Sequence, residues 1–206
     1  VAIFSAEQSK SELLLRLIAQ NSNLTMEQVF SGQDIELNSG IENIYNLPIY
    51  IDDSPNITSL SIKSAVSNLL KRKININLVI IDYLQLIKSN NKYNSRYEEI
   101  SAISREIKNI SRDLNIPFLV LAQLNRKLED REDKRPKLSD LRDSGNIEQD
   151  ADKVLFLYRD EVYNENTDFP HIAEILVKKN RNGKLGSIQL YFNQEHISFY
   201  SLEKEE

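Results

Sequence analysis

Continuous apolar runs alternate along the first two thirds of the chain with stretches in which apolar residues recur at helical spacing. The runs VAIFS (1–5), IYIDD (49–53), LVIID (78–82) and PFLVLAQL (117–124) predict strands. LVIID is apolar without alternation, which is typical of a parallel strand covered on both faces by helices. The helical stripes between the runs are Leu13, Leu14, Leu17 and Ile18, then Ile62, Ala65, Val66, Leu69 and Leu70, then Ile100, Ile103, Ile107, Ile110 and Leu114.

Local signals place the ends of the helices and the loops between them. Ser9-x-x-Glu12 and Thr25-x-x-Gln28 are capping-box patterns, and Gly32 predicts the end of the short second helix. The polar stretch KSNNKYNS (88–95) predicts a loop, and RKLEDREDKRPK (126–137) is too polar for a core and predicts an exposed loop.

The last third of the chain has a different pattern. Apolar runs are separated there by turns without any helical period, which favours antiparallel strands; the runs are KVLFLY, AEILVKK, GSIQLYF and HISFYSL. The expected fold is therefore α/β, a mainly parallel sheet flanked by helices with an antiparallel C-terminal strand extension. Without a repeat or linker, residues 1–206 are expected to form a single domain, and the opening at Val1 in mid-strand indicates a fragment.

Composition excludes several classes of site. The 206 residues contain no cysteine and two histidines, which removes disulfides and thiolate metal sites and disfavours a histidine-based site or triad. The formal net charge of −5 argues mildly against broad nucleic-acid binding. No apolar stretch approaches the roughly 20 residues that span a bilayer, so a soluble, intracellular protein is expected. Abundant Ile, Asn and Lys indicate AT-rich coding, hence a plastid stroma or a bacterial cytoplasm.

Polar residues follow the predicted strands where ligands bind in open α/β sheets. Glu7 follows VAIFS, Asp82 ends LVIID, and Gln123 ends FLVLA; Lys179 and Arg181 follow AEILV. Asp82 would hold a hydrated Mg²⁺ through water, Glu7 would accept a proton from an attacking water, and Gln123 would sense a terminal phosphate.

Each of these residues also has a purely structural explanation. A strand ending in Asp is common, and Glu7 could favour the N-terminus of the following helix. Lys179 and Arg181 could be cations of a hairpin turn, and an acidic face could explain Glu148, Asp150 and Asp152. The phosphate-binding pattern G-x-x-x-x-G-K-S/T is not present at any of the five glycines.

Several segments, in order, carry a family likeness. VAIFSAEQS, IYIDDSP, LVIIDYLQLI, FLVLAQLNR, SDLRDSGNIEQDAD with YRDE, and VKKNRNGKLG closely resemble the RecA-like motor domain of DnaB-type replicative DNA helicases, over nearly the whole chain. AEQS stands where that family usually has LEMS. The likeness implies that a glycine-rich phosphate loop lies immediately upstream of Val1 in the parent protein, and that this chain alone is inactive.

The resemblance also implies roles for individual residues. Glu7 matches the catalytic glutamate, Asp82 the Walker B aspartate that binds ATP with Mg²⁺, and Gln123 the γ-phosphate sensor. Lys179 and Arg181 match a cation and an arginine finger inserted into the neighbouring subunit's nucleotide site. The family therefore implies a ring-shaped homo-hexamer that unwinds duplex DNA 5′ to 3′ at the replication fork.

The implied DNA contacts face the central channel of the ring. Arg142, Asp143 and Gly145 match a loop that holds single-stranded DNA, and the 88–96 segment ending at Arg96 matches a second loop. Since a ring needs such contacts only on its inner wall, a net negative charge is compatible with this role. Primase and a helicase loader are implied partners. The alternatives are another RecA-like ATPase without unwinding activity, or a non-catalytic remnant that binds helicase subunits or DNA.

Overall fold

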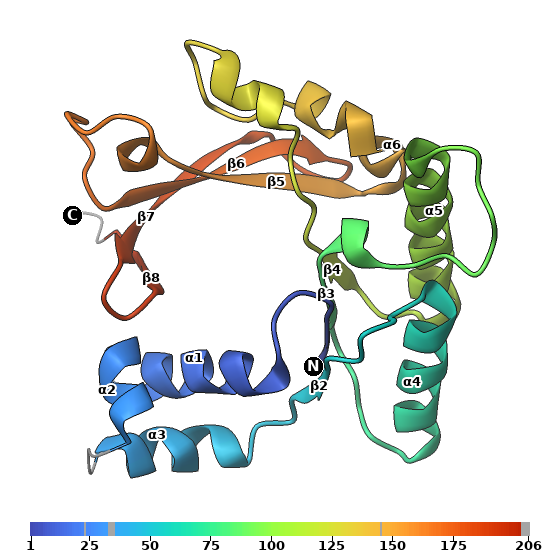
Figure 1. The fold of residues 1–206 in the computed structure, drawn as a ribbon, viewed down its shortest axis with the longest axis horizontal. Helices are drawn as coiled ribbons and strands as arrows, with labels where there is room; N and C mark the ends of the chain where they lie inside the picture. The colour runs from blue at the N-terminus through green and yellow to red at the C-terminus, as the bar shows by residue number, and fades with distance from the viewer. Residues whose placement is uncertain (23, 33–35, 145, 203–206) are drawn as a thin grey trace. The chain divides into compact units, whose positions relative to one another are not determined.

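The computed structural model describes residues 1–22, 24–32, 36–144 and 146–202. The chain divides into two compact units, which are described separately below (Figure 1). The first unit is made of Val1–Lys10, Pro48–Lys127 and Leu138–Ala151, and the second of Ser11–Leu47, Leu128–Lys137 and Asp152–Glu206. Among the described residues, no helix is both long and apolar enough to cross a bilayer.

A parallel sheet forms the centre of the first unit. Its strands are β1 (Ala2–Ser5), β2 (Tyr50–Asp52), β3 (Val79–Asp82) and β4 (Phe118–Val120), in the order β2-β1-β3-β4. All three pairings are parallel, and Ser5 stands opposite Asp82. The carboxyl ends of the strands therefore share one edge, which confirms the predicted parallel sheet and the predicted direction of its strands.

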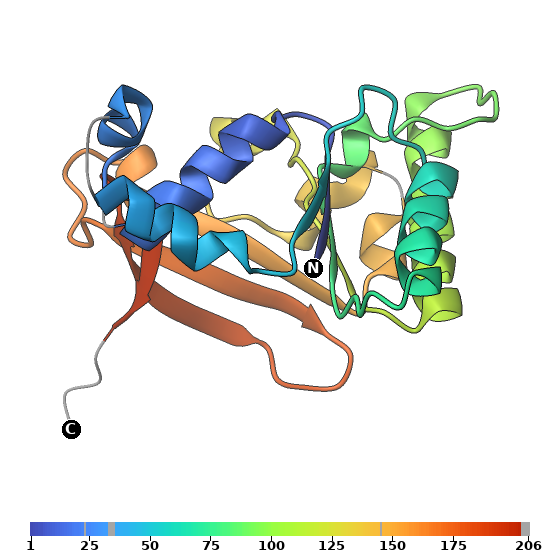
Figure 2. The same cartoon turned by 90° about the horizontal axis from the view of Figure 1, so that it is seen from below.

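Two helices pack against this sheet, α4 (Ser59–Lys71) and α5 (Arg96–Leu114), and both lie on the same side of it in the two ribbon views (Figures 1 and 2). The side chains of Ile62 and Ile103 are fully buried, as are Val79 and Ile81 of β3. The apolar stripes predicted for both helices are thus the faces that pack in the core. By the usual rate for apolar area, each fully buried Ile or Val contributes about 1.5–3 kcal/mol.

Three short elements complete the first unit: η1 (Leu84–Leu86), η3 (Leu138–Ser144) and α6 (Ile147–Asp150). The Ser104 hydroxyl on α5 donates a 2.7 Å hydrogen bond to the Asp150 carboxylate. Asp150 is therefore used in packing, which departs from a simple solvated acidic face.

The second unit contains an antiparallel sheet, as predicted for the last third of the chain. Its strands are β5 (Lys153–Arg159), β6 (Ile172–Asn180), β7 (Gly186–Asn193) and β8 (Ser198–Ser201), in sequence order (Figure 1). Along β5, buried Val154, Phe156 and Tyr158 alternate with exposed residues, the period of a strand with one packed face. The short turn η4 (Asp160–Val162) follows β5.

Three helices belong mainly to the second unit: α1 (Lys10–Ser22), α2 (Met26–Ser31) and α3 (Glu36–Tyr45). Thr25 and Gln28 form the predicted capping box, and Gly32 ends α2 with a φ of 67°. The sequence pattern did not predict α3. A Cβ at Gly40 of α3 would lie 2.7 Å from the Cβ of Ser22, so the missing side chain permits close packing against α1.

Two predicted segments differ in the structure. The strand expected over 117–124 ends at Val120, four residues before the end of the apolar run. The segment 126–137 begins with a short turn, η2 (Arg126–Asp130), and Leu128 and Pro136 are buried. The prediction of a wholly exposed loop was therefore wrong at these two positions, because isolated apolar residues can be buried beneath a charged segment.

The YRDE motif (158–161) forms a polar network in the second unit. The Tyr158 hydroxyl donates a 2.6 Å hydrogen bond to the Asp160 carboxylate, which also accepts one of 2.7 Å from Thr167. These donors hold the pKa of Asp160 below its ordinary value. Burial, together with Asp160, raises the pKa of Tyr158 to about 12. Arg135 lies 4.8 Å from the Tyr158 ring and donates a 2.7 Å hydrogen bond to Glu174.

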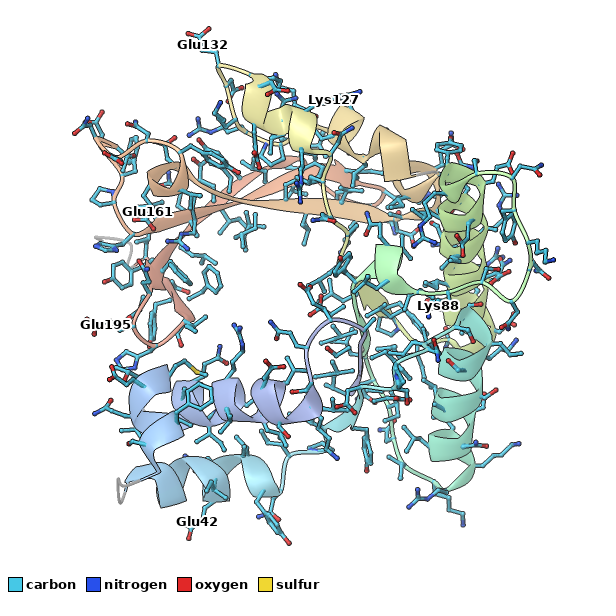
Figure 3. All side chains as sticks on the ribbon, viewed as in Figure 1. Glu42, Lys88, Lys127, Glu132, Glu161 and Glu195 are labelled. Carbon is cyan, nitrogen blue, oxygen red and sulfur yellow. The ribbon has the colours of Figure 1, made fainter. Side chains whose placement is uncertain are left out.

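The other two residues of the motif hold the connection between β5 and β6. The Glu161 carboxylate accepts hydrogen bonds from the guanidinium of Arg159 and, at 2.7 Å, from the main-chain N–H of His171 (Figure 3). The His171 N–H, followed by Arg159, lowers the pKa of Glu161. Arg159 also lies 4.0 Å from the ring of Phe192 on β7. The motif therefore stabilises the antiparallel sheet and the connection between β5 and β6.

Asp160→Asn should destabilise the protein at neutral pH. The amide offers one acceptor oxygen to the two hydroxyl donors, so a loss of about 1–2 kcal/mol is expected. Because folding lowers the pKa of Asp160, its contribution is present above the unfolded pKa near 3.9 and is lost as pH falls through the lower folded value. The difference in melting temperature between wild type and variant should therefore narrow below about pH 4.

Thermal unfolding followed by circular dichroism between pH 3 and 7 checks this expectation, with Asp168→Asn, an exposed carboxylate of the same connection, as the matched control. A difference in melting temperature that stays constant over this range would contradict the role of ionised Asp160.

Candidate functional site

Glu7 lies at the carboxyl edge of the parallel sheet, in a turn that directly follows β1. The Ala6 N–H donates a 2.7 Å hydrogen bond to the carbonyl of Asp82, which extends the β1–β3 pairing beyond the end of β1. The buried Ser5 hydroxyl donates to the carbonyl of Gln8 at 2.7 Å and accepts from its N–H at 3.2 Å. This turn presents Glu7, an exposed residue, above the edge.

The first N–H of α1 is bonded to a carboxylate from another strand. The first residue of α1, Lys10, donates its main-chain N–H to the Asp53 carboxylate at 2.8 Å. Asp53 follows β2 and is therefore the carboxylate that caps this helix. The carboxylate bonded to this N–H is therefore that of Asp53 and not that of Glu7.

Asp82 is the last residue of β3 and is partly buried, between the neighbouring strands β1 and β4. The peptide bond that joins it to Tyr83 is cis. Its position is the predicted one, at the end of a buried central strand, and its carboxylate shares the sheet edge with Glu7.

Gln123 lies three residues beyond β4. The Leu121 N–H donates to the carbonyl of Ile81 at 2.9 Å, so the chain still follows β3 at this point. The Gln123 main chain is then held by the side-chain amide of Gln85, while Gln123 itself is exposed. The structure thus brings Glu7, Asp82 and Gln123 to one edge of one sheet.

This edge fits a hydrated divalent cation beside a phosphate chain. Mg²⁺ usually keeps several waters and takes only one or two carboxylates together with phosphate oxygens. In the part of the chain that the structure describes, no group of three or more His, Cys, Asp or Glu residues could form a metal cage. A single partly buried carboxylate, Asp82, with Glu7 and Asp53 at the same edge, matches the sparse donor set that Mg²⁺ uses with nucleotides.

The candidate cations Lys179 and Arg181 belong to the second unit. Lys179 lies in β6 opposite Val154, and Arg181 begins the turn between β6 and β7. The Arg181 N–H donates to the carbonyl of Asp152 at 3.0 Å, and its guanidinium lies 3.1 Å from the Asp152 carboxylate. The side chain of Arg181 is 68% exposed and that of Asp152 is 50% exposed.

Two residues of the KNRNG motif (179–183) are required by the shape of the turn between β6 and β7. The Asn180 side-chain amide donates a 3.2 Å hydrogen bond to the carbonyl of Lys184 across the turn. A Cβ at Gly183 would lie 2.5 Å from that same amide nitrogen. Asn180 and Gly183 therefore fix the shape of the turn, and Arg181 extends from it.

The residues expected to contact DNA are only partly described. Arg96 is the first residue of α5; its guanidinium donates to the carbonyl of Gln85 and pairs with the Glu99 carboxylate. Arg142 and Asp143 lie in η3, and Gly145 is outside the described residues.

Residues 88–95 form the predicted loop, without helix or regular strand. The loop is tied to its surroundings at its start, where the Lys88 ammonium donates a 2.6 Å hydrogen bond to Asn56 (Figure 3). The Lys88 N–H also donates to the carbonyl of Ile57 at 2.9 Å.

Sequence reasoning missed three residues that support the candidate site: Asp53, Gln85 and Asp152. Asp53 could have been found, because it ends a predicted strand just as Asp82 does. Gln85 interrupts an apolar run, but the pattern gives no hint of its partner. The pairing of Asp152 with Arg181 spans 29 residues and depends on the register of β5 and β6.

Comparison with known sequences gives a match to the family model of the DnaB-like helicase C terminal domain over residues 1–201. The chain is 41% identical to the replicative DNA helicase DnaB of Geobacillus stearothermophilus over 210 residues, covering 99% of the chain and 46% of that protein. It is 44% identical to a probable replicative DNA helicase of Trieres chinensis, covering 97% of the chain and 46% of that protein. The chain spans about half the length of these relatives.

Solved structures give the same result. The ATPase domain of G40P matches with a TM-score of 0.93 at 37% identity, covering 98% of this chain and 74% of the other. A DnaB-like replicative helicase, studied with its interactions with primase, matches with a TM-score of 0.92 at 37% identity, covering 98% and 50%. The RadB recombinase, at 15% identity and a TM-score of 0.53, shares the fold alone.

These matches confirm both the predicted resemblance and the RecA-like fold. With a family model matched over residues 1–201 and the strand-end carboxylates and amide in place at one sheet edge, the chain belongs to the DnaB-like helicase C-terminal domain family.

Proposed function

We propose that this chain is part of the motor of a replicative DNA helicase, which hydrolyses ATP with Mg²⁺ and unwinds duplex DNA 5′ to 3′ at the replication fork. The observation that carries the proposal is the placement of Glu7, Asp82 and Gln123 at one edge of a parallel sheet, in a chain of this family. Residues 1–206 would lie within one motor domain of the longer protein.

The roles follow from chemistry at that edge. Asp82 would hold Mg²⁺ through water, and the ion would neutralise charge on the phosphates. Glu7, exposed and not needed to cap α1, would accept the proton of the attacking water. Gln123 would donate from its side-chain amide to the terminal phosphate and so report its presence.

Lys179 and Arg181 would act in the nucleotide site of a neighbouring subunit. A contact in which the cations of one subunit meet the strand edge of the next is heterologous, and such a contact repeats into a ring when its rotation closes. The proposed assembly is a homo-hexamer. The exposure of the Arg181 side chain at a fixed turn supports this role, because the guanidinium can reach a partner.

Single-stranded DNA would pass along Arg142, Asp143 and Gly145 on one segment and Arg96 on another. Backbone contacts of this kind position the strand without reading sequence. Arg96 would exchange its pairing with Glu99 for a phosphate when DNA is present.

Primase and a helicase loader are the proposed partners. Support for primase comes from the similar DnaB-like replicative helicase whose solved structure describes its interactions with primase. The proposed compartment is a plastid stroma or a bacterial cytoplasm. An ATPase without unwinding activity and a non-catalytic remnant are not favoured, since the matched relatives are replicative helicases.

A strand-displacement assay on forked DNA tests this function in the full-length protein that contains the chain. ATP-dependent release of the strand is expected from a fork with a 5′ tail and not from one with only a 3′ tail. Asp82→Asn should lose both hydrolysis and displacement, whereas Asp168→Asn should retain both. Hydrolysis without displacement, even with a loader present, would overturn the helicase assignment and favour another ATPase.

A further inference from the structure

Beyond the ends of β3 and β4, the side-chain amide of Gln85 replaces the main chain of β3 as the hydrogen-bonding partner of the residues that follow β4. Up to Leu121 the two chains pair through their main chains: the Leu121 N–H donates to the Ile81 carbonyl, and the Leu84 N–H donates to the Leu121 carbonyl, both at 2.9 Å. After Leu84 the main chain turns into η1, so it can no longer supply a partner for the residues that follow Leu121.

The Gln85 side-chain amide supplies that partner. Its Nε2 donates a 2.9 Å hydrogen bond to the carbonyl of Gln123, and its Oε1 accepts a 3.1 Å hydrogen bond from the Gln123 N–H. Only one orientation of the amide group places a donor against the carbonyl and an acceptor against the N–H. The two bonds therefore fix both the position and the direction of the Gln123 main chain.

Gln85 itself stands on a rigid base. Its turn is anchored by Leu84, with 2% of its surface exposed, and by Ile87, which is fully buried. The Ile87 N–H donates back to the Leu84 carbonyl at 3.1 Å. A residue held on such a base can position another one accurately.

The other end of Gln85 is held from the 88–96 segment. The guanidinium of Arg96 donates to the main-chain carbonyl of Gln85 and pairs with Glu99. The second oxygen of Glu99 accepts the N–H of Ser89 at 3.3 Å. Gln85 is thus bonded on one side to Gln123 and on the other to the residues that bound the loop.

We propose that Gln85 is the positioning residue of Gln123 and links it to the loop that ends at Arg96. The inference rests on the proposed function, in which Gln123 meets the terminal phosphate. Gln123 lies beyond its strand and is exposed, so without the Gln85 amide its main chain would sample several positions. Since a displacement of about 1 Å at a reacting centre can cost on the order of 100-fold in rate, fixing this main chain matters for turnover.

The test uses Gln85→Met and Gln85→Glu in the full-length protein. Met keeps the volume and loses both hydrogen bonds, whereas Glu keeps the acceptor and loses the donor. We expect kcat for ATP hydrolysis to fall about tenfold or more with Met and by less with Glu, with KM for ATP changed less than twofold. Stimulation of hydrolysis by single-stranded DNA should fall with kcat, and the melting temperature should stay within a few degrees, because water can satisfy the exposed Gln123 main chain.

Gln189→Met, which changes an exposed amide on β7 in the same way, should leave every readout unchanged. A Gln85→Met protein with wild-type kcat and wild-type DNA stimulation would overturn the proposal.

A double-mutant cycle with Gln123→Ala tests whether Gln85 affects kcat through Gln123. If Gln85 acts through Gln123, adding Gln85→Met to Gln123→Ala should lower kcat no further. An equal loss in both backgrounds would overturn the positioning role while leaving the proposed function intact. Normal turnover of Gln123→Ala alone would refute the role of Gln123 in the proposed function, and the positioning role with it.

Discussion

Arg181→Ala in the full-length protein should lower kcat for ATP hydrolysis by about 10³–10⁵, with nucleotide affinity nearly unchanged. An arginine finger stabilises charge that develops on the transferred phosphoryl group, so its loss is felt in the transition state and little in the ground state. Steady-state hydrolysis gives kcat, and titration with a fluorescent nucleotide gives the affinity.

The structure explains how Arg181 can serve another subunit. Its ion pair with Asp152 is between two exposed side chains, and such pairs contribute about 0–1 kcal/mol. Leaving Asp152 for a phosphate therefore costs little. The turn itself stays in place through the Arg181 N–H bond to the Asp152 carbonyl and through Asn180.

Lys184→Ala is the matched control, since Lys184 is an exposed cation of the same turn. Mixed rings give a sharper test of action between subunits. Arg181→Ala subunits retain Glu7, and Glu7→Gln subunits retain Arg181, so mixing two inactive proteins should restore hydrolysis at interfaces that combine the intact halves. Wild-type turnover of Arg181→Ala, or no recovery on mixing, would contradict the proposed finger.

The pattern of apolar residues predicted the elements that build the sheet edge, because those elements are determined locally. The buried runs of β1 and β3, the stripes of α4 and α5 and the capping box of α2 each depend on residues close in sequence. The rule that ligands lie beyond strand ends then led to Glu7, Asp82 and Gln123.

The features that were missed depend on partners distant in sequence. Helix α3 contains Gly40, a poor helix former, and its close approach to Ser22 is visible only in three dimensions. Gln85 and Gln123 are 38 residues apart, and their contact arises because η1 turns the chain away from β4. Arg96 was predicted to contact DNA, yet its bonds to Gln85 and Glu99 also give it a structural task.

Glu7→Gln should lower kcat for ATP hydrolysis by about 10²–10⁴ while nucleotide and single-stranded DNA binding persist. The amide has nearly the shape of the carboxylate but cannot accept a proton from water, so only the chemical step is affected. Because Asp53 bonds the first N–H of α1 and the Ser5 hydroxyl holds the turn, the substitution removes no hydrogen bond or ion pair seen among the residues that the structure describes. The melting temperature should therefore match that of wild type, in contrast to Asp160→Asn.

Pre-steady-state hydrolysis separates this interpretation from a binding defect. The variant should fill its nucleotide sites at wild-type concentrations of ATP and then fail to release phosphate in a single turnover. Glu27→Gln, an exposed glutamate in the first turn of α2, is the matched control and should hydrolyse ATP normally. If Glu7→Gln instead keeps its turnover, Glu7 is not the general base, and another group at the sheet edge must accept the proton. Asp53 is the next carboxylate to test there. One of its oxygens already accepts the N–H of Lys10, which leaves the other oxygen for a proton.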